Sequence, residues 1–171
     1  MEHMMTLLSK TAEKMIAYLD GDTHEISHFM AVWSYASLIG TLEGLCETEQ
    51  HTLELAAIVH DIACPLCRRK YGHASGAHQE KEGGPLARAF LEECGYPEDT
   101  VNRVAFLVAH HHTYYCVEGM DWQILLEADL LVNAAEQNYS KERVKIFTDR
   151  IFRTKSGIRL AETIYGKDIR S

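Results

Sequence analysis

Apolar residues recur every three or four positions along almost the whole chain, and the strict alternation that marks a half-buried strand is hard to find. This periodicity predicts an all-α protein, a helical bundle of about seven or eight helices. The breaks between helices are marked by Gly21-Asp22, by "CGYPEDT" at 94–100 and by "EGMD" at 118–121. The helices are expected at about 4–19, 24–44, 49–63, 80–94, 98–111, 120–137, 140–152 and 156–165.

No internal repeat, low-complexity tract or shift in composition divides the chain, so we expect a single domain over residues 1–171. Residues 138–171 are expected to form C-terminal helices that pack on the rest of it. The longest irregular stretch is "CPLCRRKYGHASGAHQ" at 64–79. Loops on rigid scaffolds often carry function, and we predict that this segment is a loop over the functional site.

Three of the most apolar predicted helices each carry groups that are costly to bury. His28 lies in "SHFMAVWSYASLIG", His60 and Asp61 close "LELAAIVHDIA", and Asp129 lies in "ILLEADLLVNAA". An uncompensated buried ion is strongly destabilising, so these groups are expected to meet a cation. One such histidine alone is more often a hydrogen-bonded core residue. Together, two imidazoles and two carboxylates suit one divalent transition metal such as Mn, Fe, Co, Ni or Zn.

The composition of the chain limits the classes of molecule that it is expected to bind. The chain has 46% apolar and 25% charged residues, which is typical of a globular protein. Its net charge of −8 disfavours nucleic-acid polymers and anionic membranes, because phosphate contacts need clustered Lys and Arg. No stretch approaches the roughly 20 apolar residues of a membrane span, and "MEHMMTLLSK" lacks the apolar segment of a secretory signal. We expect a cytoplasmic protein, and leave a homodimer open.

The five cysteines are an odd number scattered through a helical chain, unlike the disulfide framework of a small secreted domain. We therefore expect reduced thiols. Cys64 and Cys67 form one C-x-x-C, but a structural zinc site normally needs a second pair of ligands. Packing of the two thiols is the expected role, and a zinc knuckle or a redox function is the alternative.

The order H…HD…D on helices, formed by His28, His60-Asp61 and Asp129, resembles the HD superfamily of metal-dependent phosphohydrolases over roughly residues 22–135. The resemblance implies a helical bundle in which these four residues bind one divalent metal. It also implies that a metal-activated water, oriented by Asp61, hydrolyses a phosphate ester or anhydride of a small molecule such as a nucleotide. Two alternatives stay open: a di-iron oxygenase of the HD type, and a sensor module that binds a nucleotide without turnover.

In many members of that superfamily, further histidines complete a second metal position or bind phosphate. The corresponding stretches here look like "AHQEKEGGPLA" and "VAHHHTYY". The first departs from the pattern because Gln79 stands at the aligned position, beside His78. One metal is therefore preferred and a second is the alternative. We predict that His110 and His111 contact phosphate or a second cation. Since each helical residue turns about 100°, His112 is expected to point elsewhere.

Charged residues nearby have two interpretations each. Glu80 and Glu82 begin a predicted helix, where carboxylates favour the macrodipole, or one of them is the acid or base of the reaction. Arg68, Lys70 and Lys81 flank the predicted loop and are either solvated charges or groups that neutralise substrate phosphates. The aromatic residues are expected in the core, with stacking on a nucleobase as the alternative. They are Trp33, Tyr114, Tyr115 and Trp122.

Overall fold

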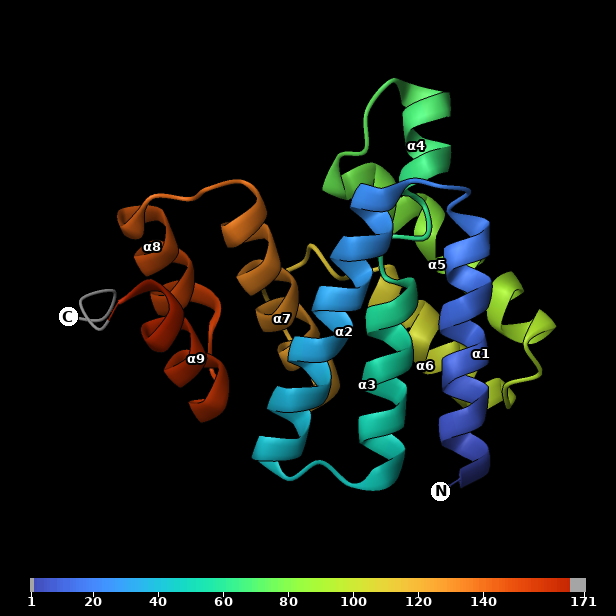
Figure 1. Ribbon diagram of the computed structural model, residues 1–171, viewed down its shortest axis with the longest axis horizontal. Helices are drawn as coiled ribbons and strands as arrows, with labels where there is room; N and C mark the ends of the chain where they lie inside the picture. Colours follow the sequence, from blue (N-terminus) through green and yellow to red (C-terminus); the bar gives the residue numbers. More distant parts are fainter. Residues whose placement is uncertain (1, 167–171) are drawn as a thin grey trace.

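The computed structural model describes residues 2–166 of the chain, with side chains from residue 6 onward. Over this range it has nine α-helices and no β-strand, which confirms the predicted all-α class (Figure 1). The helices are α1 (Glu2–Tyr18), α2 (Thr23–Glu43), α3 (Glu47–Val59), α4 (Cys64–Tyr71), α5 (Gly76–Glu93), α6 (Glu98–Val108), α7 (Met120–Glu136), α8 (Lys141–Ile151) and α9 (Lys155–Tyr165).

Local side chains set several helix ends. The Asp22 carboxylate accepts a hydrogen bond from the Glu25 backbone N–H at 3.2 Å, which begins α2. The same helix ends at Gly44, whose φ of 77° suits glycine because it has no Cβ. Ser140 and Thr154 cap α8 and α9 in the same way as Asp22 caps α2. Short polar side chains thus satisfy backbone donors that a helix start leaves free.

Helix α7 lies in the middle of the bundle, packed against α2 and α3, with α8 and α9 on its other side (Figure 1). Every residue from Asp121 to Val132 is buried, including Leu125 at 0% exposure. Each large apolar side chain buried in this way contributes about 1.5–3 kcal/mol to folding. Because α7 is surrounded by other helices, a polar residue on it needs a partner within the protein. The buried carboxylate of Asp129 must therefore be paired with a group inside the bundle.

The prediction of a loop over residues 64–79 is wrong, because Cys64–Tyr71 form α4 and α5 already begins at Gly76. Pro65 lies in the first turn of α4, where its fixed φ and missing N–H are tolerated. Gly72, with a φ of 79°, ends the helix. The helix was hidden in the sequence because only Cys64 and Cys67 of its eight residues are buried, which leaves almost no apolar stripe.

Two other predicted helices end early. The helix predicted over 49–63 ends at Val59, and the one predicted over 98–111 ends at Val108. Residues 60–63 and 109–112 therefore form turns, which changes the directions of the histidines that they carry.

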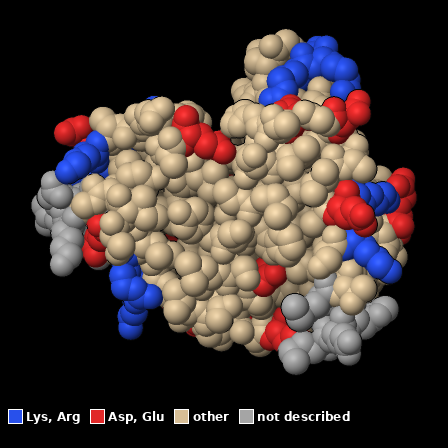
Figure 2. Space-filling model, viewed as in Figure 1, with Lys and Arg blue, Asp and Glu red and all other residues tan. Residues whose placement is uncertain are grey.

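Charged side chains lie mainly at the margins of the face shown in Figure 2, and the central surface of that face is largely uncharged. None of the described helices has the length and hydropathy needed to cross a membrane.

Candidate metal centre

The four side chains predicted to bind a metal meet in the core. His28 comes from α2, His60 and Asp61 from the turn after α3, and Asp129 from α7. His28 Nε2 lies 3.2 Å from His60 Nε2, 3.4 Å from Asp61 Oδ2 and 3.2 Å from Asp129 Oδ1. His60 Nε2 lies 3.5 and 3.6 Å from the same two oxygens. Atoms that bind one ion at about 2.1 Å are about 3.0–3.4 Å apart, so the distances of 3.2–3.6 Å are close to those around a shared divalent cation.

Hydrogen bonds on the outer nitrogens turn both imidazoles toward the cluster. His60 Nδ1 donates to the Ala57 carbonyl oxygen at 2.8 Å, and His28 Nδ1 donates to Glu136 Oε2 at 2.9 Å. A carbonyl oxygen only accepts, so the Nδ1 of His60 carries a proton and its Nε2 lone pair faces the cluster when the ring is neutral. This is the arrangement that a metal ligand needs.

The electrostatics of the cluster also favour a cation. Burial alone would lower the pKa of His28, but the hydrogen bond to Asp129 and the charge of Asp61 raise it to about 10. Burial alone would raise the pKa of Asp129, yet hydrogen bonds from His28 and His60 hold it below its ordinary value. The pKa of Asp61 is likewise lowered against its burial, chiefly by the charge of His60. Both carboxylates are ionised, and a cation would take the place of imidazole protons.

A second group of ligand atoms lies on the other oxygen of Asp61. Asp61 Oδ1 is 3.2 Å from His111 Nε2. Gln79 Oε1 is 3.2 Å from His111 Nε2 and 3.0 Å from His112 Nε2. Burial, together with the charge of His111, lowers the pKa of His112 to about 4, so its ring is neutral at pH 7. Asp61, His111 and His112 are close enough to hold an ion, and Asp61 joins this group to the first.

Among the three adjacent histidines, His110 points away from the cluster and His112 points toward it, so the predictions that His110 contacts phosphate or a second cation and that His112 points elsewhere are both wrong. The His110 ring stacks on Phe106, with ring centroids 4.2 Å apart, and its edge meets Trp122. Its Nδ1 donates to the Phe106 carbonyl oxygen at 2.7 Å. The rotation of 100° per residue does not apply here, because α6 ends at Val108 and the histidines lie in the following turn.

Glu80 anchors the turn that carries the histidines. Its Oε1 accepts hydrogen bonds from the His112 backbone N–H at 3.0 Å and from the Thr113 hydroxyl at 2.9 Å. These bonds fix the position of His112 relative to α5. Lys81, the next residue, is exposed.

Two predicted site residues, Lys70 and Glu82, bind each other. Lys70 Nζ lies 2.8 Å from Glu82 Oε1, and the Tyr71 hydroxyl donates to the same oxygen at 2.6 Å. The ring of His78 stacks on the ring of Tyr71, and the two ring centroids are 3.8 Å apart. The structure thus gives these three predicted residues partners between α4 and α5 in place of the metal cluster.

Arg68, another predicted site residue, also forms ion pairs within the protein. Its guanidinium donates to Glu25 Oε1 at 2.8 Å and to Asp22 Oδ2 at 3.0 Å, which ties α4 to the start of α2. Cys64 and Cys67 are buried free thiols on the same short helix. Burial raises the pKa of Cys64 far above its ordinary value, so its thiol stays protonated and unreactive.

The sequence interpretation missed two residues that contact the predicted ligands. Asn133 Nδ2 donates to Asp129 Oδ1 at 2.7 Å, and Glu136 binds His28. Both lie on the same face of α7 as Asp129, four and seven residues further along. This helical spacing was the available signal.

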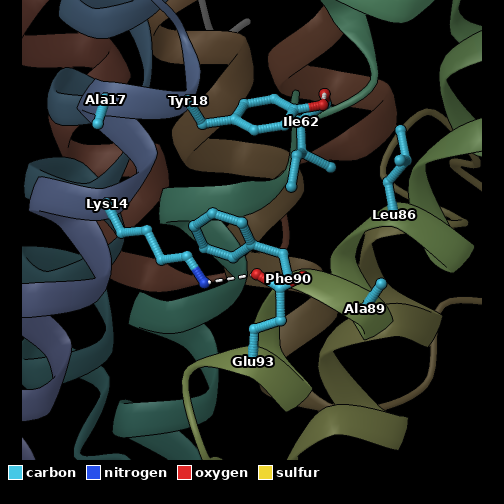
Figure 3. Close-up of a pocket in the computed structure, with 8 residues that line it drawn as sticks. All are labelled: Lys14, Ala17, Tyr18, Ile62, Leu86, Ala89, Phe90 and Glu93. Carbon is cyan, nitrogen blue, oxygen red and sulfur yellow. Dashed lines mark hydrogen bonds and ion pairs between the residues drawn. The ribbon is translucent and has the colours of Figure 1, made fainter.

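An apolar cavity of about 470 Å³ lies between α1 and α5 (Figure 3). The ion pair of Lys14 with Glu93, 2.9 Å apart, lies in its lining. The Tyr18 hydroxyl donates to the carbonyl oxygen of Ile62, next to Asp61, at 3.2 Å. None of the predicted site residues lines this cavity, so it is separate from the ligand cluster.

Buried imidazoles and carboxylates on an all-α scaffold define a candidate divalent-metal protein. The HD domain family matches residues 26–148, and the chain belongs to this family. The fold is similar to the crystal structure of a predicted HD superfamily hydrolase from an uncultured Thermotogales bacterium, with a TM-score of 0.62 and 24% sequence identity. That similarity covers 96% of this chain and 84% of the other. None of the curated proteins matches the chain.

Proposed function

We propose that the protein is a metal-dependent phosphohydrolase that cleaves a phosphate ester or anhydride of a small molecule. The observation that carries the proposal is that His28 Nε2 and His60 Nε2 each lie 3.2–3.6 Å from one oxygen of Asp61 and one oxygen of Asp129. Membership of the HD domain family supports it. A mixed set of nitrogen and oxygen ligands suits Mn, Fe, Co, Ni or Zn better than Mg or Ca.

Differences in exposure indicate from which side a substrate reaches the site. The side chain of Asp61 is 17% exposed, whereas those of His60 and Asp129 are 0% and 4% exposed. Substrate would therefore approach over Asp61. When bound, a divalent cation acts as a Lewis acid on a phosphoryl oxygen and makes water a better nucleophile near neutral pH. Asp61 has an oxygen on each ligand group, and we propose that it orients that water and accepts its proton.

The residues around the second oxygen of Asp61 complete the site. His111 and His112 direct Nε2 atoms to this side, where they can donate to phosphoryl oxygens or hold a second cation. Gln79 offers an amide oxygen where an imidazole would be a better transition-metal ligand. We therefore propose one firmly held metal, with a second position that binds weakly. Because this second group could hold a second metal ion, a di-iron oxygenase is the other candidate function.

We propose a nucleotide as the substrate, because two exposed aromatic rings, Tyr114 and Tyr115, follow the site histidines closely in the chain. Tyr114 is 39% exposed and Tyr115 is 74% exposed. Burial raises the pKa of Tyr114 to about 12, with the charge of Asp129 adding to the effect. By contrast, the indole of Trp122 is 4% exposed and donates to a backbone carbonyl. The two tyrosines are thus the rings free to stack on a base.

The test is elemental analysis of protein purified without chelators, followed by a screen of phosphate esters and nucleotides with Mn²⁺, Co²⁺, Ni²⁺, Fe²⁺ and Mg²⁺. The expected result is bound metal and release of phosphate or a phosphorylated product. Oxygen consumption by an iron-loaded protein would favour the oxygenase. Tight nucleotide binding without turnover in any metal would favour a sensor module. Protein that binds none of these metals would contradict the proposal.

A further inference from the structure

Three of the four imidazoles that direct Nε2 into the two ligand groups, those of His28, His60 and His111, differ in what binds their Nδ1 atoms. His60 and His111 donate to backbone carbonyl oxygens three residues earlier, at 2.8 and 2.7 Å. His28 donates to a carboxylate, Glu136 Oε2, at 2.9 Å, from a residue 108 positions away. One of the three rings is therefore oriented by an ionisable side chain from another helix.

Helix α7 contacts both nitrogens of His28. Asp129 Oδ1 lies 3.2 Å from Nε2 and Glu136 Oε2 lies 2.9 Å from Nδ1. The two acidic residues are seven positions apart, which is about two helical turns and places them on one face. The imidazole of α2 is thus held at both ends by a single helix.

The helix itself gains nothing from this glutamate. Glu136 is the last residue of α7, at the negative end of the helix dipole, where an acidic side chain is unfavourable. Its side chain is 26% exposed, and its carboxylate accepts a hydrogen bond from His28. This contact, and not the helix, accounts for an acidic residue at this position.

We propose that Glu136 is a positioning residue for the metal centre. Its carboxylate keeps the proton of His28 on Nδ1 and fixes the ring so that Nε2 points at the ion, and its negative charge makes the imidazole a stronger ligand. The inference rests on the proposed function, because it assigns Glu136 a role at the same metal site.

The experiment compares Co²⁺ and Mn²⁺ binding to the wild type, Glu136→Ala and Glu136→Gln by calorimetry, with the visible absorption of Co²⁺ as a spectroscopic reporter. Glu136→Ala removes the acceptor and is expected to weaken binding about 10- to 100-fold. Glu136→Gln keeps an acceptor oxygen without its charge, so it is expected to lose less than about tenfold and to shift the Co²⁺ bands.

The matched control is Glu92→Gln. Glu92 also lies in the last turn of its helix, α5, and is exposed, but its partner is Arg88. The Glu92→Gln variant makes the same change of charge as Glu136→Gln and is expected to leave metal affinity and the Co²⁺ spectrum unchanged.

Thermal unfolding of the metal-free proteins separates positioning from general support of the fold. The Tm values of metal-free Glu136→Gln and wild type are expected to agree closely, since the gain at the helix end from losing the charge offsets the weaker hydrogen bond to His28. If the wild type binds neither ion, the proposed function fails. If the wild type binds but both Glu136 variants bind within threefold of it, the inference is overturned and the proposed function stands. A loss of affinity matched by a large fall in metal-free Tm in both variants would also overturn it.

Discussion

His28 has a carboxylate on each side, and this gives the metal-free protein a characteristic pH dependence. The folded pKa of about 10 lies above the ordinary value of 6.5, so the folded state binds a proton more tightly than the unfolded chain. The resulting stabilisation is full below pH 6.5 and is lost as the pH rises to about 10. We expect the free energy of unfolding in EDTA to fall by up to about 1.4 kcal/mol per pH unit across this window.

Chemical denaturation at several pH values would measure this fall. The variant His28→Gln should show a flatter profile, and so should the metal-loaded protein, in which a cation takes the place of the proton on His28 Nε2. Equal slopes for the wild type and His28→Gln would contradict the assignment.

Asp61 is the one predicted ligand with an oxygen on each of the two ligand groups, so its replacement should affect chemistry more than structure. We expect Asp61→Asn to lose turnover by at least about 100-fold, with far-UV circular dichroism unchanged. Asp99→Asn, on the exposed first turn of α6, is the control for loss of one carboxylate. Full activity of Asp61→Asn with normal metal content would show that another residue handles the water.

At the scale of helices and turns, the sequence predicted best where the surroundings were most apolar. Asp129 stood out because residues on both sides of it in α7 are buried. Glu136 did not stand out, because it lies at the end of the same helix and is followed by the polar residues Gln137 and Asn138. The direction of His112 could not be predicted, since "VAHHHTYY" gives no sign that α6 ends at Val108. The sequence left Arg68 as either a solvated charge or a phosphate ligand, because its partner Glu25 is 43 positions away and is brought close only by the fold.

The junction of α7 with α8 and α9 depends on one buried carboxylate. Glu127 is 0% exposed. Its oxygens accept hydrogen bonds from Gln123 Nε2, from the backbone N–H groups of Arg153 and Thr154, and from the Thr154 hydroxyl. Glu127→Ala would leave these donors unpaired, and we expect a loss of about 3 kcal/mol or more. For a chain of this size, that lowers Tm by about 6–12 °C.

Guanidinium denaturation and calorimetry would measure the loss. Glu142→Ala, on the exposed first turn of α8, should change stability by less than about 0.5 kcal/mol. If both variants had the same Tm, the buried carboxylate would not be holding the C-terminal helices.

At the scale of the whole molecule, the candidate metal centre joins segments that are far apart in sequence. Its ligands come from α2, from the turn after α3 and from α7, and these helices pack on one another in the centre of the bundle. In the unfolded chain the three segments that supply the ligands are separated, so a cation binds the folded state in preference. An ion present at 100 times its Kd then stabilises the protein by about 2.7 kcal/mol.

This stabilisation predicts that metal raises the Tm by about 5–10 °C over that of EDTA-treated protein. Because imidazole ligands disfavour Mg²⁺, the rise should be larger with Co²⁺, Mn²⁺ or Zn²⁺. Differential scanning calorimetry across a metal titration would measure it. Asp129→Asn weakens the ligand set at its most buried carboxylate, so it should lose most of the rise while keeping the helical fold. An equal rise in this variant would place the stabilising ion elsewhere in the molecule, and no rise in the wild type would mean that the cluster holds no ion.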